Sequence, residues 1–351
     1  MTKGRKTRSY FAAANGFSGF RSYFKDVFST EKNKEIYILK GGPGTGKSSF
    51  MRKLSERFKD NCSLDLIYCS SDTSSLDGVI IEKNGIRVSI LDGTAPHETN
   101  PTLPGACDGI INLGESWNKN GLMNKRREIE NLTSKKSEHY KSAYEYLRLA
   151  GEIDTKIMAV TESIMCLDEE EIKSLISKNK DKNEGRSEEV MLISAFGKDG
   201  YTRLSTEPYI KESTYNVTGI FESEYVFMRK VAALCHNTEK TNILFPSPFG
   251  GDKIEGVSMS DTLLLTDCEL GTKIDTSKYL DTQKLSKKRN VLEFLEMTKS
   301  KLLALSRAEF LSASEAHFAL EEIYSAEMDF RKNDELLERT LEEISKTLKN
   351  K

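Results

Sequence analysis

The chain has 351 residues, of which 37% are hydrophobic and 30% charged, and its formal net charge is −2 at neutral pH. This length allows two domains with separate cores, and a charge so close to zero gives no overall attraction to nucleic acid or to an anionic membrane. Two of the longest uncharged runs, at 9–20 and 241–251, fall well short of the roughly 20 apolar residues that span a bilayer. The six cysteines form no Cys-x-x-Cys pair, which favours reduced thiols in a cytoplasm. We therefore expect a cytoplasmic protein with no membrane partner and no indicated nucleic-acid partner.

Strand and helix signals alternate after the N-terminal segment. The apolar stretch at 36–40 predicts a strand, 48–58 a helix, 64–69 a second strand and 88–92 a third. Because strands that alternate with helices form parallel sheets covered on both faces, the pattern predicts an α/β fold with a parallel sheet.

Two long tracts lack the residues that interrupt helices. No proline occurs between Pro104 and Pro208 or after Pro248. Apolar residues recur in both tracts at intervals of three and four, which predicts helices with one buried face. We expect one helical hairpin at about 118–178 and another at about 283–350. The stripe that we assign to helix packing consists of Ile129, Leu132, Tyr140, Ala143, Leu147 and Ala150, then Phe310, Ala313, His317, Leu320, Leu337, Leu341, Ile344 and Leu348.

A polar segment at 178–188 (KNKDKNEGRSE) separates the two halves. Its composition is typical of a flexible connection, because it offers no apolar side chain to a core. We place the domain boundary there, with a first domain at 1–180 and a second at 186–351, each including its hairpin.

Short blocks of sequence recur in the same order on both sides of this segment. FMRKL at 50–54 returns as FMRKV at 227–231, and LDGV at 76–79 returns as IEGV at 254–257. Repetition in a constant order predicts an internal duplication.

Residues 41–48 (GGPGTGKS) match the phosphate-binding P-loop pattern G-x-x-x-x-G-K-[ST], between a predicted strand and a predicted helix. Glycines let backbone N–H groups approach phosphate oxygens, and the helix N-terminus adds partial positive charge. Lys47 supplies a full charge at the β- and γ-phosphates, and the Ser48 hydroxyl is suited to ligate Mg²⁺. The predicted nucleotide-binding residues are Gly41, Gly42, Pro43, Gly44, Thr45, Gly46, Lys47, Ser48 and Ser49.

Acidic residues after two predicted strands are candidate catalytic or metal-binding groups. Asp92 ends the third strand, as a Walker B aspartate does, and is predicted to hold magnesium or its water; a simple turn residue is the alternative. Asp72 follows the second strand and is expected at the sheet edge where ligands bind. It is a candidate catalytic base or magnesium partner, and an Asx turn is the alternative. His97 and Glu98 are further candidates for orienting a water or an acceptor hydroxyl. Together with Lys47, Asp72 and Asp92 form the predicted catalytic set.

Absent motifs narrow the choice of nucleotide. The only approach to the guanine-reading motif Asn-Lys-x-Asp is NKDK at 179–182, which fails at its last position, and no Leu-Ser-Gly-Gly-Gln signature occurs. By elimination, the predicted ligand is ATP with Mg²⁺.

The motifs together resemble a known family. The blocks 37–51 (YILKGGPGTGKSSFM), 69–72 (CSSD), 76–79 (LDGV) and 91–97 (LDGTAPH) are similar to an uncharacterised bacterial family of tandemly duplicated P-loop ATPases. The resemblance covers the whole chain and implies two tandem P-loop NTPase-like units in a cytoplasmic, nucleotide-binding protein.

The chain departs from that family in its second half. Members commonly carry a second P-loop, whereas here Glu224 aligns with Lys47 and Tyr225 aligns with Ser48. The second unit is therefore predicted to be degenerate, with one nucleotide bound per chain.

Three functions remain open from the sequence. They are an ATPase whose hydrolysis drives a conformational change, a small-molecule or nucleotide kinase, and an ATP-sensing switch or scaffold with little turnover. All three use the same loop, and the partner, whether protein or small molecule, is not indicated.

Overall fold

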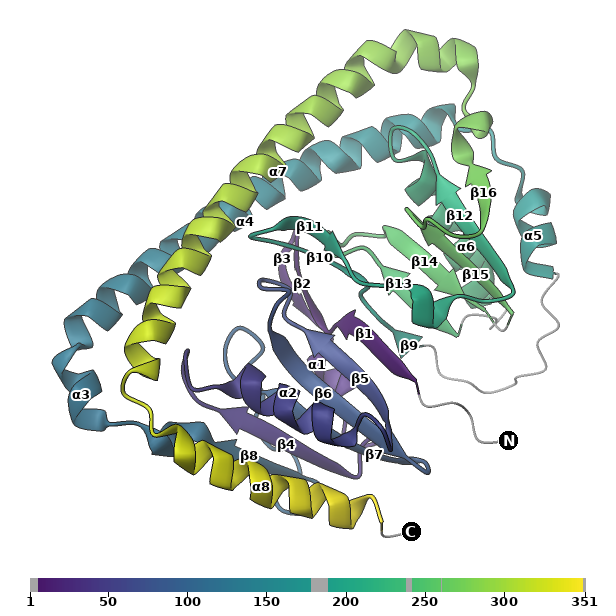
Figure 1. Ribbon diagram of the computed structural model, residues 1–351. Helices are drawn as coiled ribbons and strands as arrows, with labels where there is room; N and C mark the ends of the chain where they lie inside the picture. Colours follow the sequence, from purple (N-terminus) through teal and green to yellow (C-terminus); the bar gives the residue numbers. More distant parts are fainter. Residues whose placement is uncertain (1–5, 178–188, 238–241, 260, 350–351) are drawn as a thin grey trace.

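The computed structural model describes residues 6–177, 189–237, 242–259 and 261–349. The predicted boundary segment at 178–188 lies outside these residues. Two α/β units lie side by side, and a pair of very long helices runs across both (Figure 1).

The first unit is built on a six-stranded sheet of order β1-β5-β6-β7-β4-β8. Only β6 runs against the other strands, because it pairs antiparallel with both β5 and β7. The elements are β1 (Thr7–Phe11), β2 (Ala13–Gly16), β3 (Gly19–Ser22), α1 (Phe24–Val27), β4 (Glu35–Lys40), α2 (Lys47–Phe58), β5 (Ser63–Tyr68), β6 (Leu76–Lys83), β7 (Ile86–Asp92), β8 (Asp108–Asn112) and η1 (Leu113–Ser116).

The second unit repeats this arrangement. Its sheet has the order β16-β12-β15-β14-β13-β9, and only β14 is antiparallel to its neighbours. Read from the opposite end, the strand order and directions are those of the first sheet. The elements are β9 (Glu189–Val190), β10 (Ser194–Gly197), β11 (Gly200–Arg203), η2 (Glu207–Tyr209), β12 (Ser213–Thr218), α6 (Ser223–Asn237), β13 (Ile243–Pro246), β14 (Ile254–Ser258), β15 (Thr262–Thr266), β16 (Thr272–Asp275) and η3 (Thr276–Tyr279).

The α/β class is confirmed, and so are the strands and the helix predicted between residues 36 and 92, which correspond to β4, α2, β5 and β7. The prediction of a purely parallel sheet was wrong, because each sheet contains one antiparallel strand. In the first unit β6 and β7 form a hairpin through Asn84 (φ 54°) and Gly85 (φ 81°), the left-handed pair that a tight type I′ turn requires. The Asn-Gly pair was the sequence signal for this hairpin.

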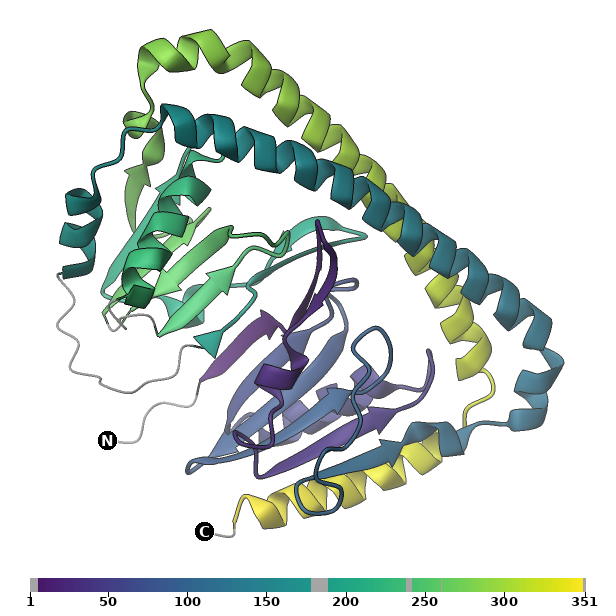
Figure 2. The same cartoon turned by 180° about the vertical axis from the view of Figure 1, so that it is seen from behind.

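The long helices do not form a hairpin within either half, which corrects a second prediction. α3 (Lys119–Asn124) and α4 (Arg126–Ile164) lead from the first unit, and α7 (Thr282–Ser325) returns from the second, so that α4 and α7 lie antiparallel along most of their length (Figures 1 and 2). Isolated β-bridges join Trp117 to Met328 at one end of the pair and Met165 to Leu280 at the other. One helix from each half therefore makes the hairpin.

The terminal helix of each half packs on the opposite unit. α8 (Phe330–Thr347) places Leu337, Leu341 and Ile344 against the core of α2 and the first sheet. α5 (Glu169–Ser177) places Ile172 against α6 of the second unit. The two packing units therefore exchange their C-terminal helices. The predicted boundary at 178–188 had assigned each of these helices to the domain of its own half. None of the helices within the described residues is both long and apolar enough to cross a membrane.

Candidate functional site

A cavity of about 660 Å³ lies at the carboxyl edge of the first sheet, under the α4–α7 pair. All of the predicted site residues, 41–49 together with Asp72 and Asp92, line it. The remaining walls come from the 69–77 segment, the 92–97 loop and the facing sides of α4 and α7. The structure thus brings the separate sequence motifs to a single cavity.

The 41–46 loop has the backbone that its glycines allow. Gly44 (φ 68°) and Gly46 (φ 83°) lie in the left-handed region, and Gly46 is the N-cap of α2. A side chain at Gly44 would also collide with the Glu321 backbone on α7. The glycines therefore serve two purposes: they shape the loop and let the second half of the chain lie against it.

Groups from the C-terminal part of the chain hold the loop in place. Ser325 Oγ donates to the Gly44 carbonyl (3.1 Å), and Asn333 Nδ2 donates to the Thr45 carbonyl (2.9 Å). The amide of Asn333 is itself oriented by Ser116 Oγ, which donates to its oxygen at 2.9 Å. The conformation of the loop consequently depends on α7 and α8 as well as on its own sequence.

Lys47 lies at the centre of the site. Its Nζ donates to the carbonyls of Gly41 and Gly42, each at 2.9 Å, and lies 3.5 Å from Asp92 Oδ2. The Lys47 and Asp92 side chains are only 12% and 13% exposed, so this ion pair is weakly screened by water. Ser48 Oγ accepts a hydrogen bond from the Leu76 backbone N–H at 2.9 Å.

Asp92 ends β7, the strand paired in parallel with β4, and lies opposite Leu39 just before the loop. Its Oδ1 accepts from the backbone N–H and the hydroxyl of Thr94, at 2.9 and 2.6 Å, while its Oδ2 faces Lys47. Asp92 therefore forms the turn that was the alternative interpretation and also faces the cavity.

The oxygen atoms of Ser48 and Asp92 are the kind of ligand that Mg²⁺ prefers. Among the described residues, no group of three or more His, Cys, Asp and Glu side chains could hold a metal ion by itself. Mg²⁺ usually keeps several waters and binds through one or two protein groups plus substrate phosphates. Two oxygen donors, from Ser48 and Asp92, fit that mode of binding.

Asp72 lies at the rim of the cavity and contacts the second unit. Its Oδ1 accepts from the Ser74 backbone N–H (3.2 Å) and hydroxyl (2.8 Å), the Asx turn considered as an alternative, and pairs with Lys198 Nζ at 3.2 Å. Partial burial raises the pKa of this carboxyl, but the Ser74 bonds and the Lys198 charge outweigh it, so the pKa lies below its usual value. Asp72 is thus held as a carboxylate.

The two further candidates, His97 and Glu98, differ in burial and in whether they line the cavity. His97 is buried, stacks on Phe24 with ring centroids 4.2 Å apart, and places Nε2 3.4 Å from Asp77 Oδ2. Burial lowers the pKa of His97, but the hydrogen bond and charge of Asp77 outweigh it and raise the pKa overall. Glu98 is exposed and does not line the cavity.

Sequence reasoning missed the side chains that α4 and α7 direct into the cavity. They belong to two helices that meet only through tertiary packing, and three of them, Tyr140, Phe310 and His317, had been assigned to the helix-packing stripe. Burial, then the charges of Lys136 and Lys47, lower the pKa of His317 to about 4. Burial, then the charge of Lys47, lowers the pKa of Lys136. The missed residues are Lys136, Tyr140, Phe310, Ser314, His317, Phe318, Glu321 and Ser325.

The corresponding region of the second unit is filled by its own charges. Four residues (219–222) connect β12 to α6, whereas six (41–46) connect β4 to α2. Lys253 Nζ pairs with Asp154 (2.7 Å) and Glu222 (2.6 Å), and Lys299 pairs with the same two carboxylates. Burial, then the neighbouring Glu222, raises the pKa of Glu224 to about 7, and its Oε2 has no hydrogen-bond partner.

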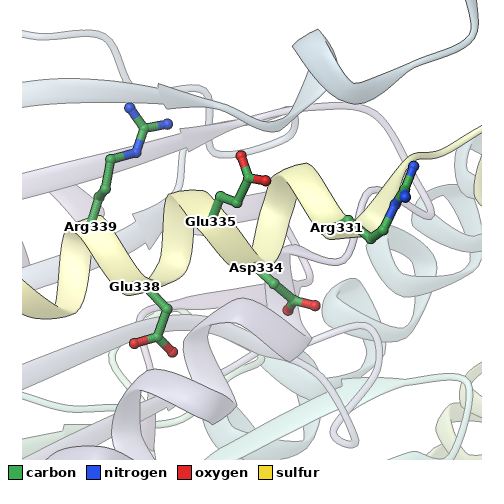
Figure 3. Close-up of a pocket in the computed structure, with 5 residues that line it drawn as sticks. All are labelled: Arg331, Asp334, Glu335, Glu338 and Arg339. Atoms are coloured by element: carbon green, nitrogen blue, oxygen red, sulfur yellow. The ribbon is translucent and has the colours of Figure 1, made fainter.

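A separate hollow of about 580 Å³ lies along α8, lined by charged side chains (Figure 3). These side chains spread around the helix rather than converging, and Asp334, which pairs with Lys53 at 2.7 Å, is 60% exposed. This hollow is a solvated helix face. Its lining residues are Arg331, Asp334, Glu335, Glu338 and Arg339.

Comparison with family models gives no match, and no curated protein and no solved structure matches the chain. The resemblance to tandemly duplicated P-loop ATPases therefore stays a prediction, and the argument for function rests on the site.

Proposed function

We propose that the chain is a P-loop ATPase that binds one Mg·ATP at the cavity under α4 and α7. The observation that carries this proposal is the segment 41–48, which joins β4 to the first turn of α2. Asp92 lies at the end of the adjacent parallel strand and faces Lys47 of this segment.

Three features support triphosphate binding. The first N–H groups of α2 have no intrahelical partner, and the helix dipole makes this end partly positive. Lys47 Nζ donates to two neutral loop carbonyls and lies 3.5 Å from Asp92, so phosphate oxygens would replace neutral acceptors with charged ones. The cavity is also large enough for an extended ligand beyond the loop.

The second unit then serves as a structural partner rather than a second site. A triphosphate at 219–222 would have to displace two carboxylates that already neutralise Lys253 and Lys299, and it would meet the carboxyl of Glu224. Like charges in a buried region repel strongly.

Substitution of Lys47 tests the proposal. Lys47→Ala removes a charged hydrogen-bond donor worth about 1.5–3 kcal/mol, so affinity for ATP should fall about 10- to 150-fold while the protein stays folded, as checked by circular dichroism. Lys53→Ala, on the exposed side of the same helix, is the matched control and should bind normally.

Calorimetric titration with ATP, followed by ADP release with and without candidate acceptors, separates the three functions. Steady ADP release from protein alone indicates an ATPase, release that depends on an acceptor indicates a kinase, and tight binding with negligible turnover indicates a switch. Equal ATP affinity in Lys47→Ala and wild type would refute the assignment of the loop.

A further inference from the structure

Lys136, on the N-terminal half of α4, faces the cavity without a partner. Four described side chains that line the cavity can carry positive charge: Lys47, His97, Lys136 and His317. His97 Nε2 lies 3.4 Å from Asp77 Oδ2. Lys47 bonds to loop carbonyls, and His317 Nε2 lies 3.6 Å from Glu321 Oε1. Lys136 forms no ion pair and no hydrogen bond with any residue that the structure describes. No arginine is among the described residues that line the cavity.

The backbone around Lys136 is held firmly by α7. His139 Nδ1 lies 2.7 Å from Glu309 Oε2, and Ser306 Oγ donates to the Ala143 carbonyl at 2.9 Å. Tyr140, one helical turn after Lys136 and also lining the cavity, packs edge-on against Phe310. The ammonium group of Lys136 is therefore carried by a fixed segment of helix and needs only side-chain rotation to sample the cavity.

The far end of α4 is anchored in the second unit. Asp154 lies 18 residues after Lys136, which is about 27 Å along an α-helix, and it pairs with both Lys253 and Lys299. The ion pairs that fill the second unit thus fix the helix that presents Lys136 to the first. This arrangement links the two units through one rigid element.

The carboxylates that line the cavity each face a cationic or imidazole partner: Asp72 faces Lys198, Asp77 faces His97, Asp92 faces Lys47 and Glu321 faces His317. Lys47 approaches from the floor and Lys136 from the α4 wall, and the charge of Lys47, after burial, lowers the pKa of Lys136. Two cations that repel each other across a cavity form an anion site between them, since an anion there relieves the repulsion. A P-loop lysine reaches the β- and γ-phosphates from the loop side. The opposite side of the terminal phosphate is the position left for a second cation.

We propose that Lys136 donates to the terminal phosphate of bound ATP, so that α4 supplies from within the chain the cation that completes the phosphate site. This inference rests on the proposed nucleotide site. Because ADP lacks the γ-phosphate, Lys136 discriminates ATP from ADP. The same contact strengthens as charge shifts during phosphoryl transfer, which makes Lys136 a catalytic residue.

The test compares Lys136→Ala with Lys135→Ala, an exposed lysine on the neighbouring position of the same helix. Both variants and the wild type are titrated with the β,γ-imido analogue of ATP and with ADP, each with Mg²⁺, and thermal unfolding confirms that they are folded. We expect Lys136→Ala to lose about 10- to 150-fold in affinity for the ATP analogue and to keep its affinity for ADP within about twofold. Lys136→Arg should retain part of the preference, and Lys135→Ala all of it.

Each outcome bears on the inference. An unchanged ratio of ATP-analogue to ADP affinity in Lys136→Ala overturns it, whether both affinities stay the same or both fall together. Failure of the wild type to bind either nucleotide overturns the proposed function and this inference with it. Normal nucleotide binding by the wild type, with no change in Lys136→Ala, overturns the inference alone.

Discussion

Replacement of Asp92 by asparagine separates its metal role from its place in the turn. The side-chain amide keeps an oxygen for the two Thr94 bonds, so the turn should persist, but the charge opposite Lys47 is lost. At 3.5 Å the pair attracts by about 5 kcal/mol at an effective dielectric of about 20, and both side chains are largely shielded from water. Asp92 also repels phosphate oxygens that Lys47 attracts.

Two opposite effects follow from that magnitude. Without Mg²⁺, Asp92→Asn should bind ATP more tightly than wild type, because Lys47 is released and a repulsive charge is gone. With Mg²⁺, the ATP hydrolysis rate should fall by at least about tenfold, equivalent to ~1.4 kcal/mol of the barrier, and the Mg²⁺ concentration needed for half-maximal activity should rise.

The assay is steady-state ADP release across a magnesium titration, together with calorimetry in EDTA. Glu98→Gln is the control, since Glu98 is exposed on the loop after Asp92 and outside the cavity. Hydrolysis by Asp92→Asn at the wild-type rate over the whole magnesium range would refute the metal role and leave only the turn.

Two further predictions concern the second unit. One nucleotide should bind per chain, because internal carboxylates already neutralise Lys253 and Lys299; a calorimetric stoichiometry of two, or binding that survives Lys47→Ala, would contradict this. Glu224, whose pKa is raised to about 7, binds a proton in the folded state that the unfolded state releases above about pH 4.5, so its stabilising contribution is complete below that pH and is lost as pH rises through 7. The free energy of unfolding of Glu224→Gln should therefore exceed that of wild type by up to about 3 kcal/mol at pH 8, measured by denaturant titration, with little difference near pH 4.5. An equal gap at both pH values would show that the carboxyl does not titrate there.

The features that sequence alone determined are those encoded by contiguous residues. The P-loop pattern, the strand before it and the helix after it depend on local backbone preferences, and Gly44 and Gly46 have the positive φ that this loop needs. The order of Lys47, Asp72 and Asp92 along alternating strands was enough to predict that they meet at one sheet edge. The antiparallel strand β6 also had a local signal in Asn84-Gly85, which was overlooked.

Tertiary packing decided everything that joins the two halves. An apolar stripe at intervals of three and four shows that a helix is buried on one face, but not which partner covers it. The stripes of α4 and α7 therefore suggested two hairpins, whereas each helix pairs with the other and each terminal helix packs on the opposite unit. Lys136 and His317 line the first unit's site from the paired helices α4 and α7, and Lys198 reaches Asp72 from the β10–β11 turn of the second unit. Their positions depend on contacts between residues far apart in the chain, which no local preference records.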